Sequence, residues 1–219
     1  MQKPDSQTTP CSVVVLISGN GSNLQALMDS SIDSNYRINK VISNKADAYG
    51  LSRAEQANIA TQFIDHRQFN SREEFDSALI VAIDEIKPDL IVLAGFMRIL
   101  SNKFVRHYSG KVLNIHPSLL PAYPGTNTHQ RVLDAGEKEH GVSVHFVTEE
   151  LDGGPIIAQD RIEILSSDNA ESLSHRIHTR EHILYPRVVS WFAAGRLRMD
   201  ANQAYLDGEL LPAAAIKPA

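Results

Sequence analysis

The sequence predicts a single α/β domain with a mostly parallel, twisted, Rossmann-like sheet, helices on both faces and last strands that are partly antiparallel. From Cys11 onward, short apolar runs alternate with amphipathic segments. Strands that alternate with helices form βαβ units, which require parallel strands. Further along, GVSVHFVT and GGPIIAQDRIEIL are longer and more alternating, which indicates antiparallel strands. The length of 219 residues fits one domain with a sizeable core.

Each element follows from a local pattern. The run CSVVVLISG at 11–19 is continuous and β-branched, which is typical of a strand buried on both faces. The clearest helix spans 71–86, because Ser71 and Glu74 form a capping-box pair and Lys87-Pro88 ends it. A long helix is expected over 169–191, interrupted near Pro186. Four more strands are expected at 38–43, 59–65, 89–95 and 111–116.

Composition and charge narrow the function classes. A net charge of −5 and a pI near 6.0 disfavour extended binding to nucleic acid or to an anionic membrane. The single cysteine, Cys11, excludes an internal disulfide and a cysteine-based zinc cluster. No apolar run is long enough for a membrane helix or shaped like a signal peptide, so a cytoplasmic protein is expected. We expect a flexible leader at 1–11, a domain at 12–212 and a flexible tail at 213–219.

The segment SGNGSNLQAL, at 18–27, follows the first strand and holds the first candidate site. Gly19 and Gly21 let the backbone turn tightly, and Ser22 or Asn23 is expected to cap a helix that starts with Leu24. Exposed amides at a helix N-terminus favour an anion such as phosphate. A tight βα turn without a ligand explains the same residues equally well. The loop has no third glycine and no Gly-Lys-Ser/Thr, so neither NAD nor ATP is supported.

The segment VLNIHPSLLP, at 112–121, ends a predicted strand with two polar side chains. Asn114 and His116 point the same way, because side chains on a strand alternate faces. An amide beside an imidazole can stabilise an oxyanion, and the imidazole can move a proton near neutral pH, as acyl transfer to an amine requires. A purely structural polar pair is the alternative. The prolines that follow predict a stiff loop in which one X-Pro bond could be cis.

A third candidate is Asp152, in the segment EELDGGPII at 149–157. Its glycines and proline predict a sharp loop that can present a carboxylate into a cleft, although alone it is an ordinary Asp-Gly turn residue. Beside His116, the carboxylate would keep the ring protonated as an oxyanion partner and acid. No Gly-x-Ser-x-Gly motif occurs, so transfer is expected to be direct between two bound substrates.

Three histidines fall on roughly one face of the last predicted helix: His175, His178 and His182. They raise the question of a metal site. No acidic or cysteine partner stands at zinc spacing, so a surface or pocket-edge role is favoured.

Together, these motifs resemble the phosphoribosylglycinamide formyltransferases, or glycinamide ribonucleotide transformylases, of the formyl-folate transferase superfamily. The resemblance covers 13–211 and rests on LISGNGSNLQAL, SNKADAYGL, VLAGFMRILS, LNIHPSLLPAYPG, GVSVHFVTEELDGGPII and TREHILYPRVVSWFAAGRL. Asn-x-His-Pro-Ser with a later Asp-Gly-Gly is highly specific for this superfamily. The resemblance implies the formyltransferase fold and transfer of the formyl group of 10-formyltetrahydrofolate to the amine of 5′-phosphoribosylglycinamide, in purine biosynthesis.

The resemblance also implies residue roles. Asn114 and protonated His116 would hold the tetrahedral oxyanion, while Asp152 keeps the histidine charged and helps proton movement. No metal is implied. The amine substrate's phosphate and ribose would bind, mainly in the N-terminal half, at Gly19, Asn20, Gly21, Ser22, Asn23 and Glu181. The folate co-substrate, assigned mainly to the C-terminal half, would bind at Arg72, Met97, Arg98, Ile99, Leu100, Asn114, Val147 and Asp152.

One departure and several alternatives remain open. After Gly125 the chain reads TNTHQ, from Thr126 to Gln130, where members usually have Leu-His-Thr-His, so the shape of that loop is not fixed by the resemblance. A methionyl-tRNA formyltransferase would need a further C-terminal domain and a basic surface, and a formyltetrahydrofolate hydrolase usually has an N-terminal regulatory domain. A non-catalytic folate- or nucleotide-binding module has no need of all three catalytic groups. The expected partners are the two small molecules, without nucleic acid or membrane, and the expected state is a monomer or homodimer.

Overall fold

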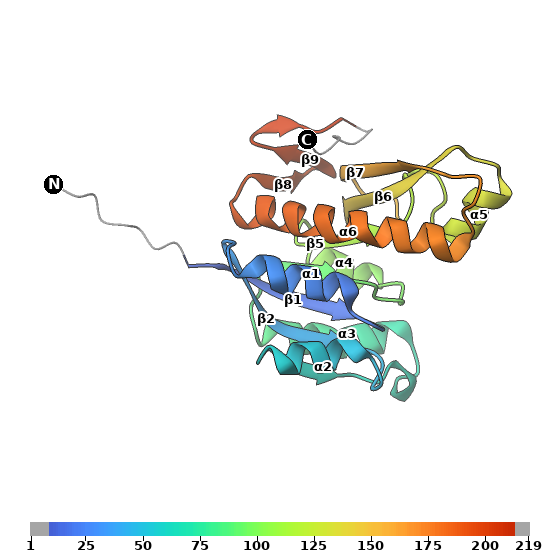
Figure 1. Ribbon diagram of the computed structural model, residues 1–219. Coiled ribbons are helices and arrows are strands. Elements are labelled where there is room, and N and C mark those ends of the chain that lie inside the picture. Colours follow the sequence, from blue (N-terminus) through green and yellow to red (C-terminus); the bar gives the residue numbers. More distant parts are fainter. Residues whose placement is uncertain (1–8, 213–219) are drawn as a thin grey trace.

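The computed structural model describes residues 9–212, and a seven-stranded sheet forms its centre (Figure 1). The strand order is β3-β2-β1-β4-β5-β6-β7. The first five strands pair in parallel and the last two pair antiparallel, which confirms the predicted sheet and the five predicted strand positions. The strands are β1 (Cys11–Ile17), β2 (Tyr36–Ser43), β3 (Ala60–Phe63), β4 (Leu90–Leu93), β5 (Val112–His116), β6 (Glu139–Phe146) and β7 (Ile156–Glu163).

Helices cover both faces of the sheet, as β1 illustrates. Val13, Val15 and Ile17 belong to one buried core, whereas Val14 and Leu16 belong to the other. This alternation explains the continuous apolar run, since every side chain from Val13 to Ile17 belongs to one of the two cores. The first core is closed by α1 (Ser22–Ser31), α2 (Tyr49–Gln56) and α6 (Ala170–Ala193), and the second by α3 (Arg72–Asp84) and α4 (Asn102–His107).

The two predicted helices are present, with one difference. The side chain of Ser71 accepts a hydrogen bond from the N–H of Glu74 at 3.1 Å, which confirms the predicted start of α3. Helix α6 runs without a break through Pro186, so the predicted interruption is wrong. Val188 and Val189, beyond the proline, are fully buried, and their packing offsets the backbone hydrogen bond that the proline removes.

The described residues refine the predicted boundaries. Cys11 is buried, and its N–H donates to the carbonyl of Asn35 at 3.0 Å, so β1 begins inside the predicted leader and one residue before the predicted domain. Positions 1–8 of the leader and the predicted tail at 213–219 lie outside the described residues. Among the residues that are described, no helix is long and apolar enough to cross a membrane.

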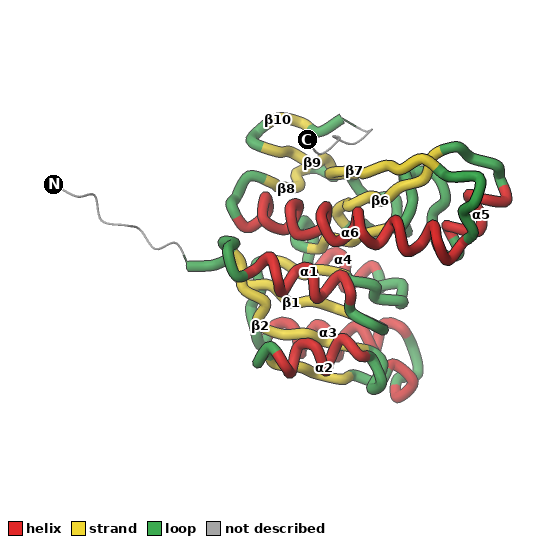
Figure 2. The backbone as a smooth tube through the Cα atoms, viewed as in Figure 1, coloured by secondary structure: helices red, strands yellow, loops and turns green. Residues whose placement is uncertain are grey.

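Shorter elements complete the fold. A second sheet, in the order β10-β9-β8, contacts α6 and was not predicted (Figure 2). Its strands have only two to four residues each, so the sequence pattern is weak. The elements are β8 (Leu197–Asp200), β9 (Gln203–Leu206), β10 (Glu209–Leu210), the 3-10 turn η1 (His66–Gln68) and α5 (Thr128–Asp134).

The parallel strands position the site. The carboxyl ends of β1, β4 and β5 lie at the same edge of the sheet, so the loops that follow them meet there. The loop after β1 is bound to the loop after β4 by a hydrogen bond from the N–H of Ser18 to the carbonyl of Gly95 at 3.1 Å. In the loop after β5, the Leu120–Pro121 peptide bond is cis.

Candidate active site

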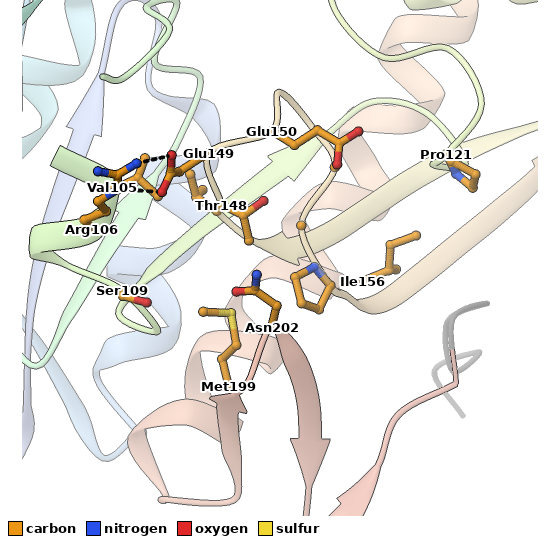
Figure 3. Close-up of a pocket in the computed structure, with 14 residues that line it drawn as sticks. Val105, Arg106, Ser109, Pro121, Thr148, Glu149, Glu150, Ile156, Met199 and Asn202 are labelled. Carbon is orange, nitrogen blue, oxygen red and sulfur yellow. Dashed lines mark hydrogen bonds and ion pairs between the residues drawn. The ribbon is translucent and has the colours of Figure 1, made fainter. Parts of the chain in front are cut away.

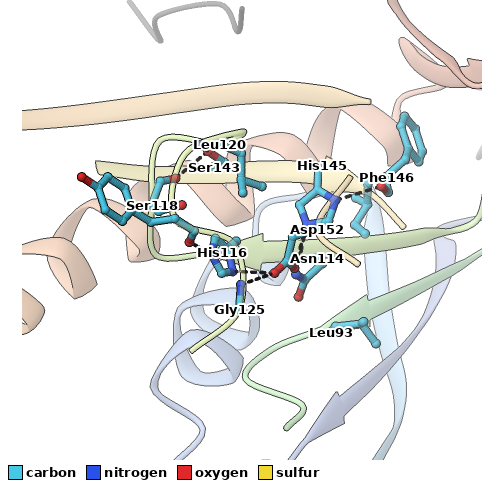
Figure 4. Close-up of polar contacts among 12 residues, drawn as sticks. Leu93, Asn114, His116, Ser118, Leu120, Gly125, Ser143, His145, Phe146 and Asp152 are labelled. Carbon is cyan, nitrogen blue, oxygen red and sulfur yellow. Dashed lines mark hydrogen bonds and ion pairs between the residues drawn. The ribbon is translucent and has the colours of Figure 1, made fainter. Parts of the chain in front are cut away.

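The three predicted catalytic side chains meet at the end of β5 (Figure 4). Nδ1 of His116 lies 3.5 Å from Oδ2 of Asp152, and its Nε2 lies 3.0 Å from the carbonyl oxygen of Tyr123. The ring of His116 therefore lies between two oxygens that can accept hydrogen bonds. The side chains of His116 and Asp152 are 7% and 10% exposed, so water screens their interaction little.

The loop that carries Asp152 is held in a sharp turn. Asp152 has a φ of 51°, and its Oδ2 also accepts a hydrogen bond from the N–H of Gly125 at 2.9 Å, which ties this loop to the loop after β5. A Cβ at Gly154 would lie 1.8 Å from the carbonyl oxygen of Phe146, so only glycine fits there. The carboxylate therefore has a fixed position beside the imidazole.

A second histidine, His145, orients Asn114 and was missed by the sequence analysis. It lies opposite Asn114 in the β5–β6 pairing and is 2% exposed. Its Nδ1 donates to the carbonyl of Phe146 at 2.9 Å, so its Nε2 is free to accept from Nδ2 of Asn114 at 3.1 Å. Burial lowers the pKa of His145, in agreement with this neutral ring. Only the register of the two strands, which the sequence does not contain, could have shown this contact.

The predicted phosphate loop is built differently from the expectation. Helix α1 begins at Ser22 with Gly21 as its N-cap, at a φ of 75°, and no side chain caps it. The expected capping by Ser22 or Asn23 and the start at Leu24 are therefore wrong, because glycine makes the turn at low steric cost. The amides of the first turn are thus left uncapped by side chains, which suits an anion.

The side chain of Asn23 turns toward α6 instead. Its Nδ2 donates to Oε2 of Glu181 at 2.7 Å, and Glu181 is only 4% exposed. Burial raises the pKa of Glu181. The predicted ribose residue therefore comes from the C-terminal half of the chain and contacts the loop of the N-terminal half.

Two adjoining cavities lie beside the β6–β7 loop and share five lining residues. The larger, of about 570 Å³, includes the Arg106–Glu149 ion pair but none of the three catalytic candidates (Figure 3). The smaller, of about 160 Å³, is lined by Asn114 and Asp152, so we assign the site to it. Its other predicted folate residues are Arg72, Arg98, Ile99, Leu100 and Val147.

Met97 is the predicted folate residue that the structure does not place in this cavity. Its side chain is 69% exposed, and its backbone N–H donates to Oγ of Ser18 at 2.8 Å. Ser18 in turn donates to Oδ1 of Asn44 at 2.6 Å. The loops after β1 and β4 are therefore joined through a buried hydroxyl.

A buried carboxylate, missed by the sequence analysis, fixes the other end of the loop after β4. Asp76 on α3 is fully buried, and its Oδ2 accepts a hydrogen bond from the N–H of Ser101 at 2.5 Å. Burial raises the pKa of Asp76, and the positive charges of Arg72 and Arg98 oppose that rise. Asp76 thus fixes the backbone next to Leu100, which lines the smaller cavity.

The remaining histidines do not assemble a metal site. The rings of His178 and His182 stack with an interplanar angle of 7°, and over residues 9–212 no group of three or more metal-ligating side chains is placed to hold an ion. Nδ1 of His129 lies 2.9 Å from Nε2 of His140. Burial lowers the pKa of both rings and brings that of His140 to about 4, so the pair is neutral.

Comparisons with known proteins identify relatives of this chain. A sequence model of the formyl transferase family matches residues 11–189. Phosphoribosylglycinamide formyltransferase of Escherichia coli is 55% identical over 202 residues, which are 91% of this chain and 95% of that protein. The solved structure of phosphoribosylglycinamide formyltransferase from Coxiella burnetii is 56% identical, has a TM-score of 0.91 and covers 95% of this chain and 99% of its own. The trifunctional purine biosynthetic protein adenosine-3 of Bos taurus is 48% identical over 87% of this chain and 19% of that protein.

Proposed function

This chain belongs to the formyl transferase family, and on that premise we propose that it moves the formyl group of 10-formyltetrahydrofolate to the amine of 5′-phosphoribosylglycinamide. It is a formyltransferase of purine biosynthesis. Relatives that it matches over nearly their whole length are named phosphoribosylglycinamide formyltransferase. The products are 5′-phosphoribosyl-N-formylglycinamide and tetrahydrofolate. One observation supports the mechanism: Asn114, His116 and Asp152 meet, and two of them line one cavity.

The proposed reaction is a direct attack through a tetrahedral intermediate. The amine nitrogen bonds to the formyl carbon, whose oxygen becomes an oxyanion, and the bond from that carbon to N10 of folate then breaks. The attacking nitrogen loses one proton and N10 gains one. Preorganised donors aimed at such an oxyanion are typically worth about 10²- to 10³-fold in rate each.

Asn114 and His116 supply that stabilisation. One N–H of the Asn114 amide is held by His145, so the other is oriented to donate to the oxyanion. The imidazolium of His116, held between Asp152 and a backbone carbonyl, contributes its positive charge. Asp152 keeps that charge in place and takes part in moving the proton from the amine, through a water molecule.

The substrate sites are proposed from the residues that line the two regions. The glycine loop and the uncapped amides of α1 bind the phosphate, and Glu181 accepts hydrogen bonds from ribose hydroxyls. The apolar side chains of the smaller cavity cover the folate ring, and Arg72 and Arg98 carry charges suited to the folate carboxylates. A role for Met97, the monomer or homodimer state and a cytoplasmic location stay predictions.

Steady-state kinetics of three variants test this proposal. His116→Ala and Asn114→Ala are each expected to lower kcat by at least about 10²-fold, and Asp152→Asn by a similar factor, because each removes a charge or donor aimed at the reacting atoms. Thermal unfolding of each variant controls for misfolding. A folded variant of His116 or Asp152 with wild-type kcat would contradict the mechanism.

A further inference from the structure

The loop proposed to bind phosphate has no cation of its own, and a cation reaches it from α2. The loop reads SGNGSN at 18–23. Arg53 donates from Nε to the carbonyl of Asn20 at 3.0 Å and from a terminal nitrogen to Oδ1 of Asn20 at 3.1 Å, and its other terminal nitrogen donates to Oε1 of Gln25 at 3.2 Å. One guanidinium therefore holds both the loop and the first turns of α1.

Helix α2 is seated against the loop by glycine contacts. The N–H of Gly50 donates to the carbonyl of Gly19 at 3.1 Å, and a Cβ at Gly21 would lie 2.7 Å from the Cα of Gly50. This close approach places Arg53, one turn further along α2, beside the loop; its Cδ lies 3.7 Å from the Cβ position of Gly21. The segment SNKADAYGL therefore has a structural role: it contains Gly50, which lets α2 approach the loop closely. The catalytic groups do not explain this segment.

The charge of Arg53 is not neutralised by its protein partners. Over the described residues its partners are the neutral side chains of Asn20 and Gln25, a carbonyl, and the ring of Tyr49, whose centroid lies 4.8 Å from the guanidinium carbon. These hydrogen bonds use three of the five N–H groups of the guanidinium. A positive charge with spare donors beside a helix N-terminus favours a dianionic phosphate monoester.

We propose that Arg53 is a positioning residue for the substrate phosphate: it fixes the glycine loop in its anion-binding shape and adds the charge that the loop lacks. The proposal rests on the proposed function. Arg53 is expected to differ from the catalytic groups in the effect of its loss. Without Arg53, the phosphorylated amine should bind more weakly, while folate binding and the chemical step stay nearly intact.

The test compares Arg53→Ala, Arg53→Lys and Arg53→Gln with the wild type. Arg53→Ala is expected to raise the KM for phosphoribosylglycinamide about 10- to 100-fold, the effect of losing charged hydrogen bonds. The kcat and the KM for formyl folate are expected to change less than about threefold. Arg53→Lys should recover more than Arg53→Gln, because it keeps the charge, and only the charged variants should show a KM that rises with salt. Arg196→Ala removes a half-exposed arginine that precedes β8 and pairs with Asp207, and it serves as a control.

A second measurement does not depend on turnover. Calorimetric titration with inorganic phosphate should show binding to the wild type that weakens at least about tenfold in Arg53→Ala. Equal phosphate binding and equal KM in the two folded proteins would overturn the proposal. A wild type that binds phosphate through Arg53 but transfers no formyl group would instead overturn the proposed function and leave the role of Arg53 standing.

Discussion

His145 offers a test of how the structure holds Asn114. Replacing it by leucine removes the acceptor for the Asn114 amide and the donor for the Phe146 carbonyl, in a place where only 2% of the histidine is exposed. An unsatisfied buried polar group costs about 1–3 kcal/mol, so two such groups are expected to lower the free energy of unfolding by about 2–6 kcal/mol. If the amide also loses its orientation, the lost stabilisation of the oxyanion corresponds to about 10- to 100-fold in kcat.

The assay compares His145→Leu with His145→Gln. The amide oxygen of glutamine reaches the place of Nε2 and can still accept from Asn114, so His145→Gln is expected to keep kcat within about fivefold of wild type. Both variants are measured by urea unfolding and by steady-state transfer at saturating substrates. A folded His145→Leu protein with wild-type kcat would show that Asn114 does not need this partner.

Three further predictions follow from the same structure. The pKa of His140, lowered to about 4 by burial, lies below its unfolded value near 6.5, so the unfolded state binds more protons as pH falls; this residue alone should lower stability by about 3 kcal/mol from pH 7 to pH 4, and urea titrations should show the pH dependence reduced by about that amount in His140→Gln. Gly21→Ala places a Cβ 2.7 Å from the Cα of Gly50, at a residue with a φ of 75°. The free energy of unfolding measured by calorimetry should therefore fall by about 1–3 kcal/mol, and an unchanged Tm would contradict this close packing. Asp76→Ala frees the N–H of Ser101 and should raise the KM for formyl folate about tenfold, with Asp76→Asn close to wild type; equal KM values in all three proteins would mean that the loop needs no anchor.

The fold could be predicted because its signals are local. β-branched runs predict the strands, and Ser71 and Glu74 predict a helix start within four residues. The break expected at Pro186 was wrong because the cost of a proline is local whereas the burial of Val188 and Val189 is tertiary. The start of α1 was wrong because glycine at position 21 makes the turn that a serine or asparagine cap was expected to make.

In the candidate site, too, the residues with a local sequence signal could be predicted and those that depend on tertiary contacts could not. Asn114 and His116 could be placed on one face from strand alternation, and Asp152 could be placed in a sharp loop. Their supporting residues could not be found, since His145 depends on the register between β5 and β6. Arg53 likewise binds loop groups that are distant in sequence, and no local pattern distinguishes it from a solvated arginine.

The most direct test of the central claim is whether deformylation requires the amine. Purified protein is mixed with 10-formyltetrahydrofolate, with and without phosphoribosylglycinamide, and loss of the formyl group is followed by absorbance together with formation of the formylated amine. Formyl loss that occurs only with the amine, matches product one to one and collapses in His116→Ala is the predicted result. Equally fast formyl loss without the amine would show that water is the acceptor and would contradict the account.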